Sequence, residues 1–208
     1  MFVLTIDQRD SRADTDRVGD VLAMLNDPAL ATGRVRRFER TAGDEVQGVV
    51  EDPDLVVALA LTLVREGHWS VGIGTGGVRQ PLPRSARAGA GAAYEHARAA
   101  VERAKRSQDR VAVVGPDTPA VEQAEGLLAL LSAIVQRRSA AGWEAVDLVA
   151  GGMPQTEAAA RLGISKQALS QRLQAGWWPH ETRVRPVAAR LLGEADPELS
   201  VPATRMDP

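Results

Sequence analysis

The segment from Gln155 to Leu173 constrains the fold more than any other part of this 208-residue chain. Ala159 is a small residue where two crossing helices would touch, and Gly163, four residues later, lets the chain turn. Ser165 is suited to cap a second helix. The apolar contacts between the two helices would come from Leu162, Ile164, Leu169 and Leu173. Together these residues predict a helix-turn-helix.

Burial of that apolar side leaves a polar face of the second helix pointing outward. Its side chains are Lys166, Gln167, Ser170, Gln171 and Arg172. Gln can form two hydrogen bonds with adenine, and Lys reaches guanine or phosphate. From Arg161 to Arg190 the chain has six Lys or Arg against the single acid Glu181, a net charge of +5, although the whole chain carries −2. Residues 153–176 are therefore predicted to bind the major groove of double-stranded DNA.

Some features of this region leave alternatives open. Arg172 stands where many such motifs have an aliphatic residue, and the two helices could instead form an ordinary bundle pair or a surface for protein contact. Arg183 is a further candidate for DNA contact, unless it is simply solvated. The pair Trp177-Trp178 is expected to pack within the bundle rather than to stack on bases.

No sequence feature points to a membrane or to an oxidising compartment. The chain has no Cys, which excludes disulfides, thiol nucleophiles and Cys-ligated zinc or iron–sulfur sites. No basic leader follows Met1, and the longest apolar stretches, such as residues 55–64, are too short to span a bilayer. We expect a cytoplasmic protein with no membrane partner.

The first half reads as alternating strands and helices. Strands are predicted at 2–6, 35–41, 46–50, 69–76 and 110–114, and helices at 11–26, 53–67 and 92–106. The order β-α-β-β-α-β-α-β contains the split βαβ arrangement of ferredoxin-like folds. The predicted fold class is α+β, with a sheet domain at 1–116 followed by an all-α part at 117–193. In that part a helix at 121–138, ended by Gly142, links the domains, and the tail 194–208 is expected to be mobile.

Acidic residues mark two places in the first half. Asp7 ends the first strand, and Asp44 and Glu45 lie in the hairpin turn. If these strands are neighbours, the carboxylates converge and can hold magnesium beside a nucleotide. Turn chemistry explains the same residues equally well. Gly74 lies in a strand whose glycines imply close approach by a backbone or a ligand.

The first half resembles the catalytic fold shared by class III nucleotidyl cyclases and GGDEF domains. Asp7 matches their first metal aspartate, Thr41–Glu45 the hairpin with the second, and Val71–Gly76 the strand that follows. A closer similarity is to the SatD family, small bacterial proteins with a cyclase-like core, and it is carried by Asp7–Ser11, Thr41–Gly48 and Ala93–Lys105. The resemblance covers about residues 2–115. It implies a nucleotide ligand at Asp7, Asp44, Glu45 and Gly74, with magnesium at Asp7 and Asp44.

Departures from the cyclases argue against catalysis. The asparagine and arginine that cyclases place on the late helix would fall at Glu95 and Ala99, so the groups that orient ribose and stabilise phosphate charge are missing. No catalytic residue is therefore assigned. Nucleotide binding requires less than turnover does, and five arginines are candidate phosphate partners unless they are merely solvated: Arg36, Arg37, Arg40, Arg84 and Arg87.

These observations lead to one expectation and two alternatives. We expect a bacterial transcription regulator that binds DNA as a homodimer, with a degenerate cyclase-like domain that dimerises or binds a nucleotide or cyclic nucleotide effector. No cofactor is required, although magnesium could accompany the nucleotide. The first alternative is a metal-dependent nucleotidyl cyclase-type enzyme with a helical targeting module, and the second is a structural adaptor.

Overall fold

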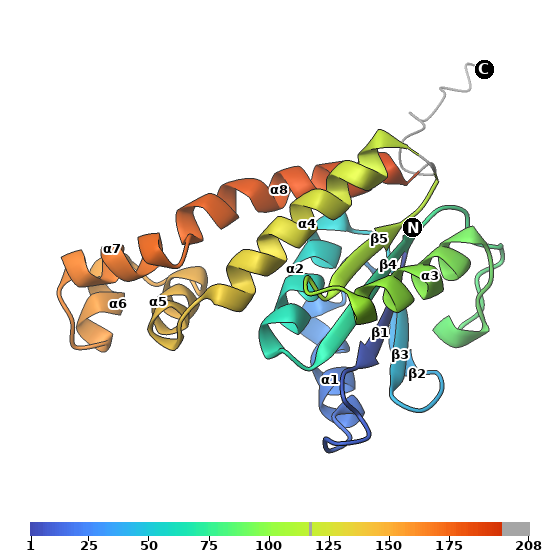
Figure 1. The fold of residues 1–208 in the computed structure, drawn as a ribbon, viewed down its shortest axis with the longest axis horizontal. Coiled ribbons are helices and arrows are strands. Elements are labelled where there is room, and N and C mark those ends of the chain that lie inside the picture. Colours follow the sequence, from blue (N-terminus) through green and yellow to red (C-terminus); the bar gives the residue numbers. More distant parts are fainter. Residues whose placement is uncertain (117, 197–208) are drawn as a thin grey trace.

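A computed structural model of the protein describes residues 1–116 and 118–196 and has an α+β fold. A five-stranded mixed sheet lies at one end, a small group of helices lies at the other, and two long helices run between them (Figure 1). The sheet half contains β1 (Phe2–Gln8), α1 (Val18–Leu25), β2 (Arg34–Arg40), β3 (Glu45–Val50), α2 (Pro53–Glu66), β4 (Trp69–Thr75), α3 (Ala92–Arg106) and β5 (Val111–Val114). Two short 3-10 turns, η1 (Pro28–Leu30) and η2 (Ala86–Ala88), lie in its loops.

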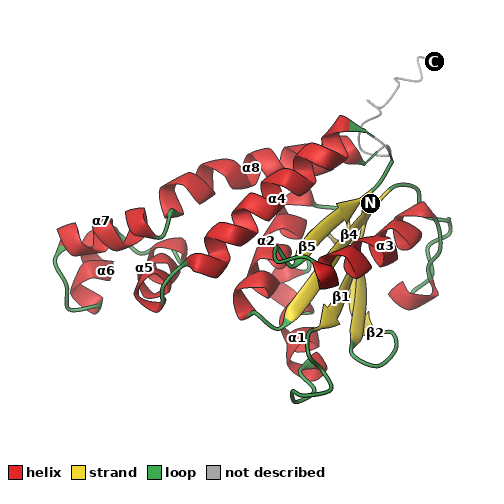
Figure 2. Cartoon of the chain, viewed as in Figure 1, coloured by secondary structure: helices red, strands yellow, loops and turns green. Residues whose placement is uncertain are grey.

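The sheet has the strand order β2-β3-β1-β4-β5 (Figure 2). Neighbouring strands are antiparallel except β4 and β5, which are parallel. The side chains of Phe2, Leu4 and Ile6 join the main core with α1 and α2, whereas Val3 packs with Ala93 and Ala97 of α3 on the other face. This alternation is the period of two expected of a strand buried on both faces.

Two glycines of β4 let α3 lie directly on the sheet. A Cβ at Gly72 would be 2.2 Å from the backbone nitrogen of Val101, and one at Gly74 would be 2.1 Å from the carbonyl oxygen of Ala93. Both distances are far below van der Waals contact. The close approach expected at Gly74 is therefore made by the backbone of α3.

Two sequence-predicted helix boundaries are wrong. The first helix begins at Val18 instead of Ser11, because the Gln8 side chain holds the intervening loop: its amide donates to the Thr15 carbonyl (2.7 Å) and its Oε1 accepts from Arg17 N–H (2.9 Å). Further along, Gly142 does not end a helix. It lies in the first turn of α5, where its N–H donates to the capping Ser139 hydroxyl at 3.1 Å.

The second half is entirely helical over its described residues. It comprises α4 (Pro119–Arg137), α5 (Ala140–Ala150), α6 (Gln155–Arg161), α7 (Lys166–Ala175) and α8 (Trp178–Ala195). α4 and α8 lie side by side and pack on α2, while α5, α6 and α7 form a compact unit at the far end (Figure 1). That unit has its own small core of Ala145, Val146, Ala158, Ala159, Leu169 and Leu173.

α8 extends beyond the predicted domain boundary at residue 193. Ala195 and Asp196 are buried, and the Asp196 carboxylate pairs with the amino group of Met1. The remainder of the predicted tail, 197–208, lies outside the described residues. Within the described ranges, no helix combines the length and apolar character needed to cross a membrane.

Candidate functional site

The turn between α6 and α7 has the features that the sequence predicts. Ala159 is buried in the small core, and Gly163 has φ +66°, a left-handed conformation that favours glycine. Ser165 precedes α7, and its hydroxyl accepts a hydrogen bond from Ala168 N–H at 3.1 Å. Because Leu169 and Leu173 are buried against α5 and α6, the opposite side of α7 is set outward.

The outward side of α7 carries exposed polar side chains. Its exposed side chains are Lys166, Gln167, Ser170 and Gln171, which we call the α7 face. None of the four makes a side-chain hydrogen bond or ion pair within the part of the chain that the structure describes. The helix α7 lies at the end of the molecule farthest from the sheet (Figure 1). A flat partner can therefore approach it without displacing any internal bond.

Other residues predicted near this face behave differently. Arg172 is half-buried and donates to the Glu144 carboxylate of α5 at 3.1 Å, so it braces α7 against α5. Arg183 is exposed on α8 and has no polar partner among the described residues. Trp177 and Trp178 are both predicted to pack within the bundle. Trp178 does pack against the small core, but Trp177 is 56% exposed, so the prediction is wrong for Trp177.

A buried ion pair lies where α4, α5 and α8 meet. The side chains of Arg138 and Glu181 are both 0% exposed, and the Arg138 Nη2 donates to Glu181 Oε2. Arg138 Nε also donates to the Gly176 carbonyl at 2.9 Å, and its guanidinium lies 4.2 Å from the Trp143 ring centroid. Arg185 donates to the second Glu181 oxygen at 2.9 Å. These contacts fix the α5–α7 unit to the long helices.

A second set of contacts ties the same unit to the sheet domain. Arg65, in the last turn of α2, donates to both oxygens of Asp147 in α5, at 2.6 and 2.7 Å. Its guanidinium also lies 3.7 Å from the centroid of the Trp143 ring. We call Arg65, Arg138, Trp143, Asp147 and Glu181 the joint. It connects the α7 unit physically to α2 of the sheet domain.

The sheet domain brings the predicted carboxylates together at one edge. Asp7 faces Glu45 in strand register, and Asp44 lies in the adjoining turn. The Asp7 side chain is only 14% exposed, and its Oδ2 is 2.8 Å from Lys105 Nζ, which also bonds Glu102 at 2.9 Å. We call Asp7, Asp44 and Glu45 the carboxylate edge.

Burial and ion pairing have opposite effects on the pKa values of Asp7 and Lys105. Burial is the largest influence on the pKa of Asp7 and raises it; Lys105 opposes this, the charges of Asp44 and Glu45 add to it, and the net pKa is raised. Burial also lowers the pKa of Lys105, but its bonds to Asp7 and Glu102 outweigh that effect and raise it. Asp7 of the carboxylate edge is therefore paired with an ammonium group supplied by α3.

Asp7 and Glu45, two residues near the predicted magnesium, already have partners within the protein. Lys105 occupies Asp7 Oδ2, and Glu45 Oε1 accepts from the Thr41 hydroxyl at 2.6 Å. No group of three or more metal-binding side chains occurs within residues 1–116 and 118–196. Lys105 would therefore compete with a divalent cation for Asp7. Magnesium at Asp7 and Asp44 stays a prediction.

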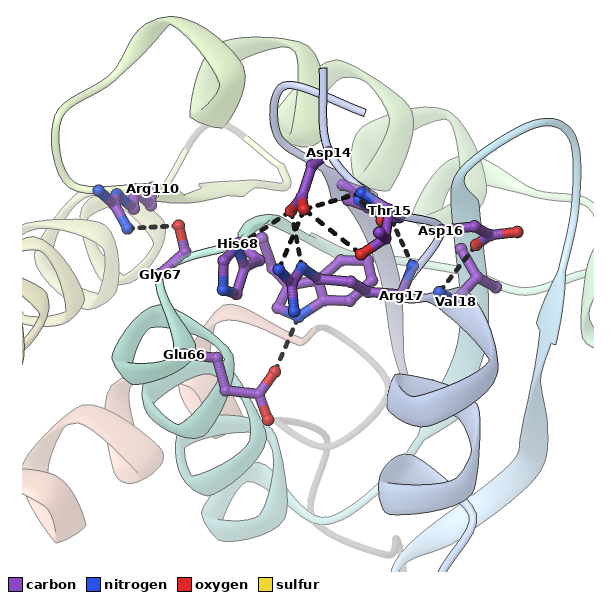
Figure 3. A network of polar contacts seen from close by, with 11 residues as sticks. Asp14, Thr15, Asp16, Arg17, Val18, Glu66, Gly67, His68 and Arg110 are labelled. Atoms are coloured by element: carbon purple, nitrogen blue, oxygen red, sulfur yellow. Dashed lines mark hydrogen bonds and ion pairs between the residues drawn. The ribbon is translucent and has the colours of Figure 1, made fainter. Parts of the chain in front are cut away.

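A polar network holds the loop between β1 and α1 (Figure 3). Asp14 accepts from Arg17 Nε at 2.7 Å and from Thr15 N–H at 2.8 Å, and His68 Nδ1 is 3.5 Å away. These contacts lower the pKa of Asp14 to about 2, and the hydrogen bond from Arg17 contributes most. The loop is thus fixed at the end of the strand that carries Asp7.

The remaining predicted residues do not converge on the carboxylate edge. Gly74 lies four positions along β4 from Ser70, the residue that faces Asp7, and is covered by α3. Arg36 donates to the Leu82 and Pro83 carbonyls, and Arg40 pairs with Asp16. Three of the candidate arginines are exposed and have no polar partner among the described residues: Arg37, Arg84 and Arg87.

Sequence analysis missed two cations on α3. Lys105 and Arg98 share one stripe of that helix with Glu95 and Glu102, because 95, 98, 102 and 105 follow helical spacing. This periodicity is visible in the sequence and could have indicated a charged stripe along α3, of which Lys105 contacts Asp7 of β1.

Comparison with protein-family models, with curated proteins and with solved structures gave no match to this chain.

Proposed function

We propose that the protein is a DNA-binding transcription regulator in which α5–α7 form a helix-turn-helix module and α7 enters the major groove. The observation that carries this proposal is the α7 face: four exposed side chains of groove-reading types with no partner in the described part of the chain. In such modules the N-terminal residues of the second helix contact bases. Lys166 and Gln167 hold those positions in α7.

In this proposal the sheet domain binds the effector. The order β2-β3-β1-β4, antiparallel throughout, with α1 and α2 on one face, supports a ferredoxin-like, cyclase-related core to which α3 and β5 are added. A nucleotide or cyclic nucleotide is the proposed effector. The joint offers a route by which a change in the sheet domain reaches α5.

Binding as a homodimer is also proposed, because a single module covers few base pairs and two half-sites increase affinity. An apolar groove of about 430 Å³ between α4 and α8 supports a contact with a second copy. Its lining includes Leu130, Ile134, Trp177 and Val184, and it begins where α7 ends. Leu130 is among the few large apolar side chains that are strongly exposed.

The test uses matched glutamine substitutions. Genomic DNA recovered with the purified protein supplies the cognate site, and binding to it is measured for Gln167→Ala, Gln171→Ala and the control Gln123→Ala, an exposed glutamine of α4. The two α7 variants should lose about 1–3 kcal/mol on the cognate site and keep their non-specific affinity. The control should bind like the parent protein. Equal loss on every DNA sequence would contradict base reading by α7.

A further inference from the structure

A polar hollow of about 360 Å³ lies between α3, the loop that precedes it and β3. Its lining includes Gln47, Arg87, Gly89, Tyr94, Glu95 and Arg98. Glu95 and Arg98 belong to the first two turns of α3, whereas Lys105, the partner of Asp7, is in its last turn. The hollow is therefore separate from the carboxylate edge.

The charged side chains around this hollow have no partner in the described part of the chain. The guanidinium groups of Arg87 and Arg98 make no hydrogen bond or ion pair with any residue that the structure describes, and the same holds for the Glu95 carboxylate. Two guanidinium groups against one carboxylate give the site a net charge of +1. Guanidinium groups bind phosphate oxygens strongly because they donate paired, charge-assisted hydrogen bonds.

One buried polar group at the hollow lacks a partner. Gln47 is 5% exposed, and its amide nitrogen donates to Thr5 Oγ1 at 3.1 Å. Tyr94 is 8% exposed, and its hydroxyl is buried without a hydrogen bond. A Cβ at Gly89 would be 1.9 Å from that hydroxyl, so glycine is required there. Because buried polar groups are nearly always satisfied, the unpaired Tyr94 hydroxyl indicates a ligand at this hollow.

We infer that the hollow binds a nucleoside monophosphate, linear or cyclic, with its phosphate at Arg87 and Arg98. Gln47 Oε1 and Glu95 are hydrogen-bond acceptors, so the ligand needs donors as well as an anionic group; sugar hydroxyls and base amino groups supply them. The volume is at the small end for ligand sites and suits one nucleotide. The net charge of +1 matches one phosphate better than three. This inference deepens the proposed function by naming the effector.

Calorimetry on the full chain tests the inference. The probes are AMP, GMP, cyclic AMP and cyclic GMP, with inorganic phosphate and adenosine as fragments of the same chemistry. At least one monophosphate should bind, and both Arg98→Ala and Arg87→Ala should weaken its binding at least about tenfold, since each removes a charge-assisted contact. Arg106→Ala, an exposed arginine later in α3, should leave the affinity unchanged.

Three results would overturn this assignment. These are no binding of any monophosphate at millimolar concentration, unchanged affinity in both Arg98→Ala and Arg87→Ala, or inorganic phosphate binding as tightly as the nucleotides. Both arginines are exposed, so circular dichroism should show native folding of the variants. No DNA is present in the calorimeter, so this inference and the proposed DNA binding fail independently.

Discussion

The α7 face and the joint use polar groups in opposite ways. On the α7 face, Lys166 and Gln171 extend into solvent with no partner in the described chain. In the joint, Arg138 and Glu181 are removed from water and bonded to each other and to neighbouring groups, although Arg138 Nη1 has no hydrogen-bond partner in the described chain. Most of the joint lies in the same helical half as the α7 face, and Arg65 of α2 is its contribution from the sheet half. Their residue types are alike, so burial decides which polar groups are available to a partner.

This difference indicates a division of labour within a few helical turns. A buried ion pair is costly to form, but once formed it makes the loss of either partner very unfavourable. An exposed charge contributes little to stability and keeps its full capacity for binding. The joint should therefore control folding, and the α7 face should control recognition. Substitutions that separate stability from DNA affinity test this comparison.

The largest expected effect on stability is at the joint. Arg138→Met leaves Glu181 buried with only Arg185, which is partly exposed, as a charged partner. The free energy of unfolding should fall by about 3–5 kcal/mol. Urea denaturation at neutral pH measures this loss. The double variant Arg138→Met/Glu181→Leu should recover most of it, because no buried charge is left unpaired.

The control for the joint uses the same substitution on an exposed pair. Arg190 bonds Glu194 one turn later on α8, and both side chains are largely in solvent. Arg190→Met should cost no more than about 0.5 kcal/mol. If Arg138→Met were no more destabilising than Arg190→Met, the joint would lose its assigned role.

The sequence predicts the local geometry around α7 well because that geometry depends on neighbouring residues. Ser165 caps its own helix, Gly163 turns its own chain, and the spacing of Leu169 and Leu173 fixes which side is buried. The strands of the sheet can be predicted for the same reason, since the alternation of their side chains and the turns between them are local signals.

Contacts between distant residues could not be predicted in this way. The start of α1 depends on Gln8 of β1. Its side chain forms hydrogen bonds with the backbone of Thr15 and Arg17, and these bonds hold the residues before α1 in a loop. The Asp7–Lys105 pair joins β1 to α3, and Arg138 meets Glu181 across two helices. These pairings follow from tertiary packing, which places residues far apart in sequence next to each other.

An intermediate effect on stability is expected at the carboxylate edge. Lys105→Met removes the ammonium beside Asp7 and should cost about 1–2 kcal/mol at pH 8. The pKa of Asp7 is already raised, and loss of Lys105 raises it further. A raised carboxyl pKa favours folding below the unfolded value and disfavours it as pH rises through the folded value. The deficit of the variant should therefore shrink as pH falls from 8 toward 4.

Denaturation across that pH range measures this deficit. Adding Asp7→Asn to Lys105→Met should remove most of its pH dependence, because the titrating group is gone. Arg106→Met, an exposed neighbour on α3, should cost less than about 0.5 kcal/mol at every pH. A deficit of constant size from pH 4 to pH 8 would show that another group is responsible.

The smallest effect on stability is expected for the free cations of the α7 end. Lys166→Ala and Arg183→Ala remove exposed charges without internal partners, so the free energy of unfolding should change by less than about 0.5 kcal/mol. Their effect should appear in DNA binding instead. A cation that contacts a phosphate releases about one counterion, so each variant should lower the salt slope of binding by about one. Fluorescence anisotropy from 50 to 300 mM salt gives that slope. A large loss of stability with an unchanged slope would place these cations with the joint, and the contrast between the two regions would fail.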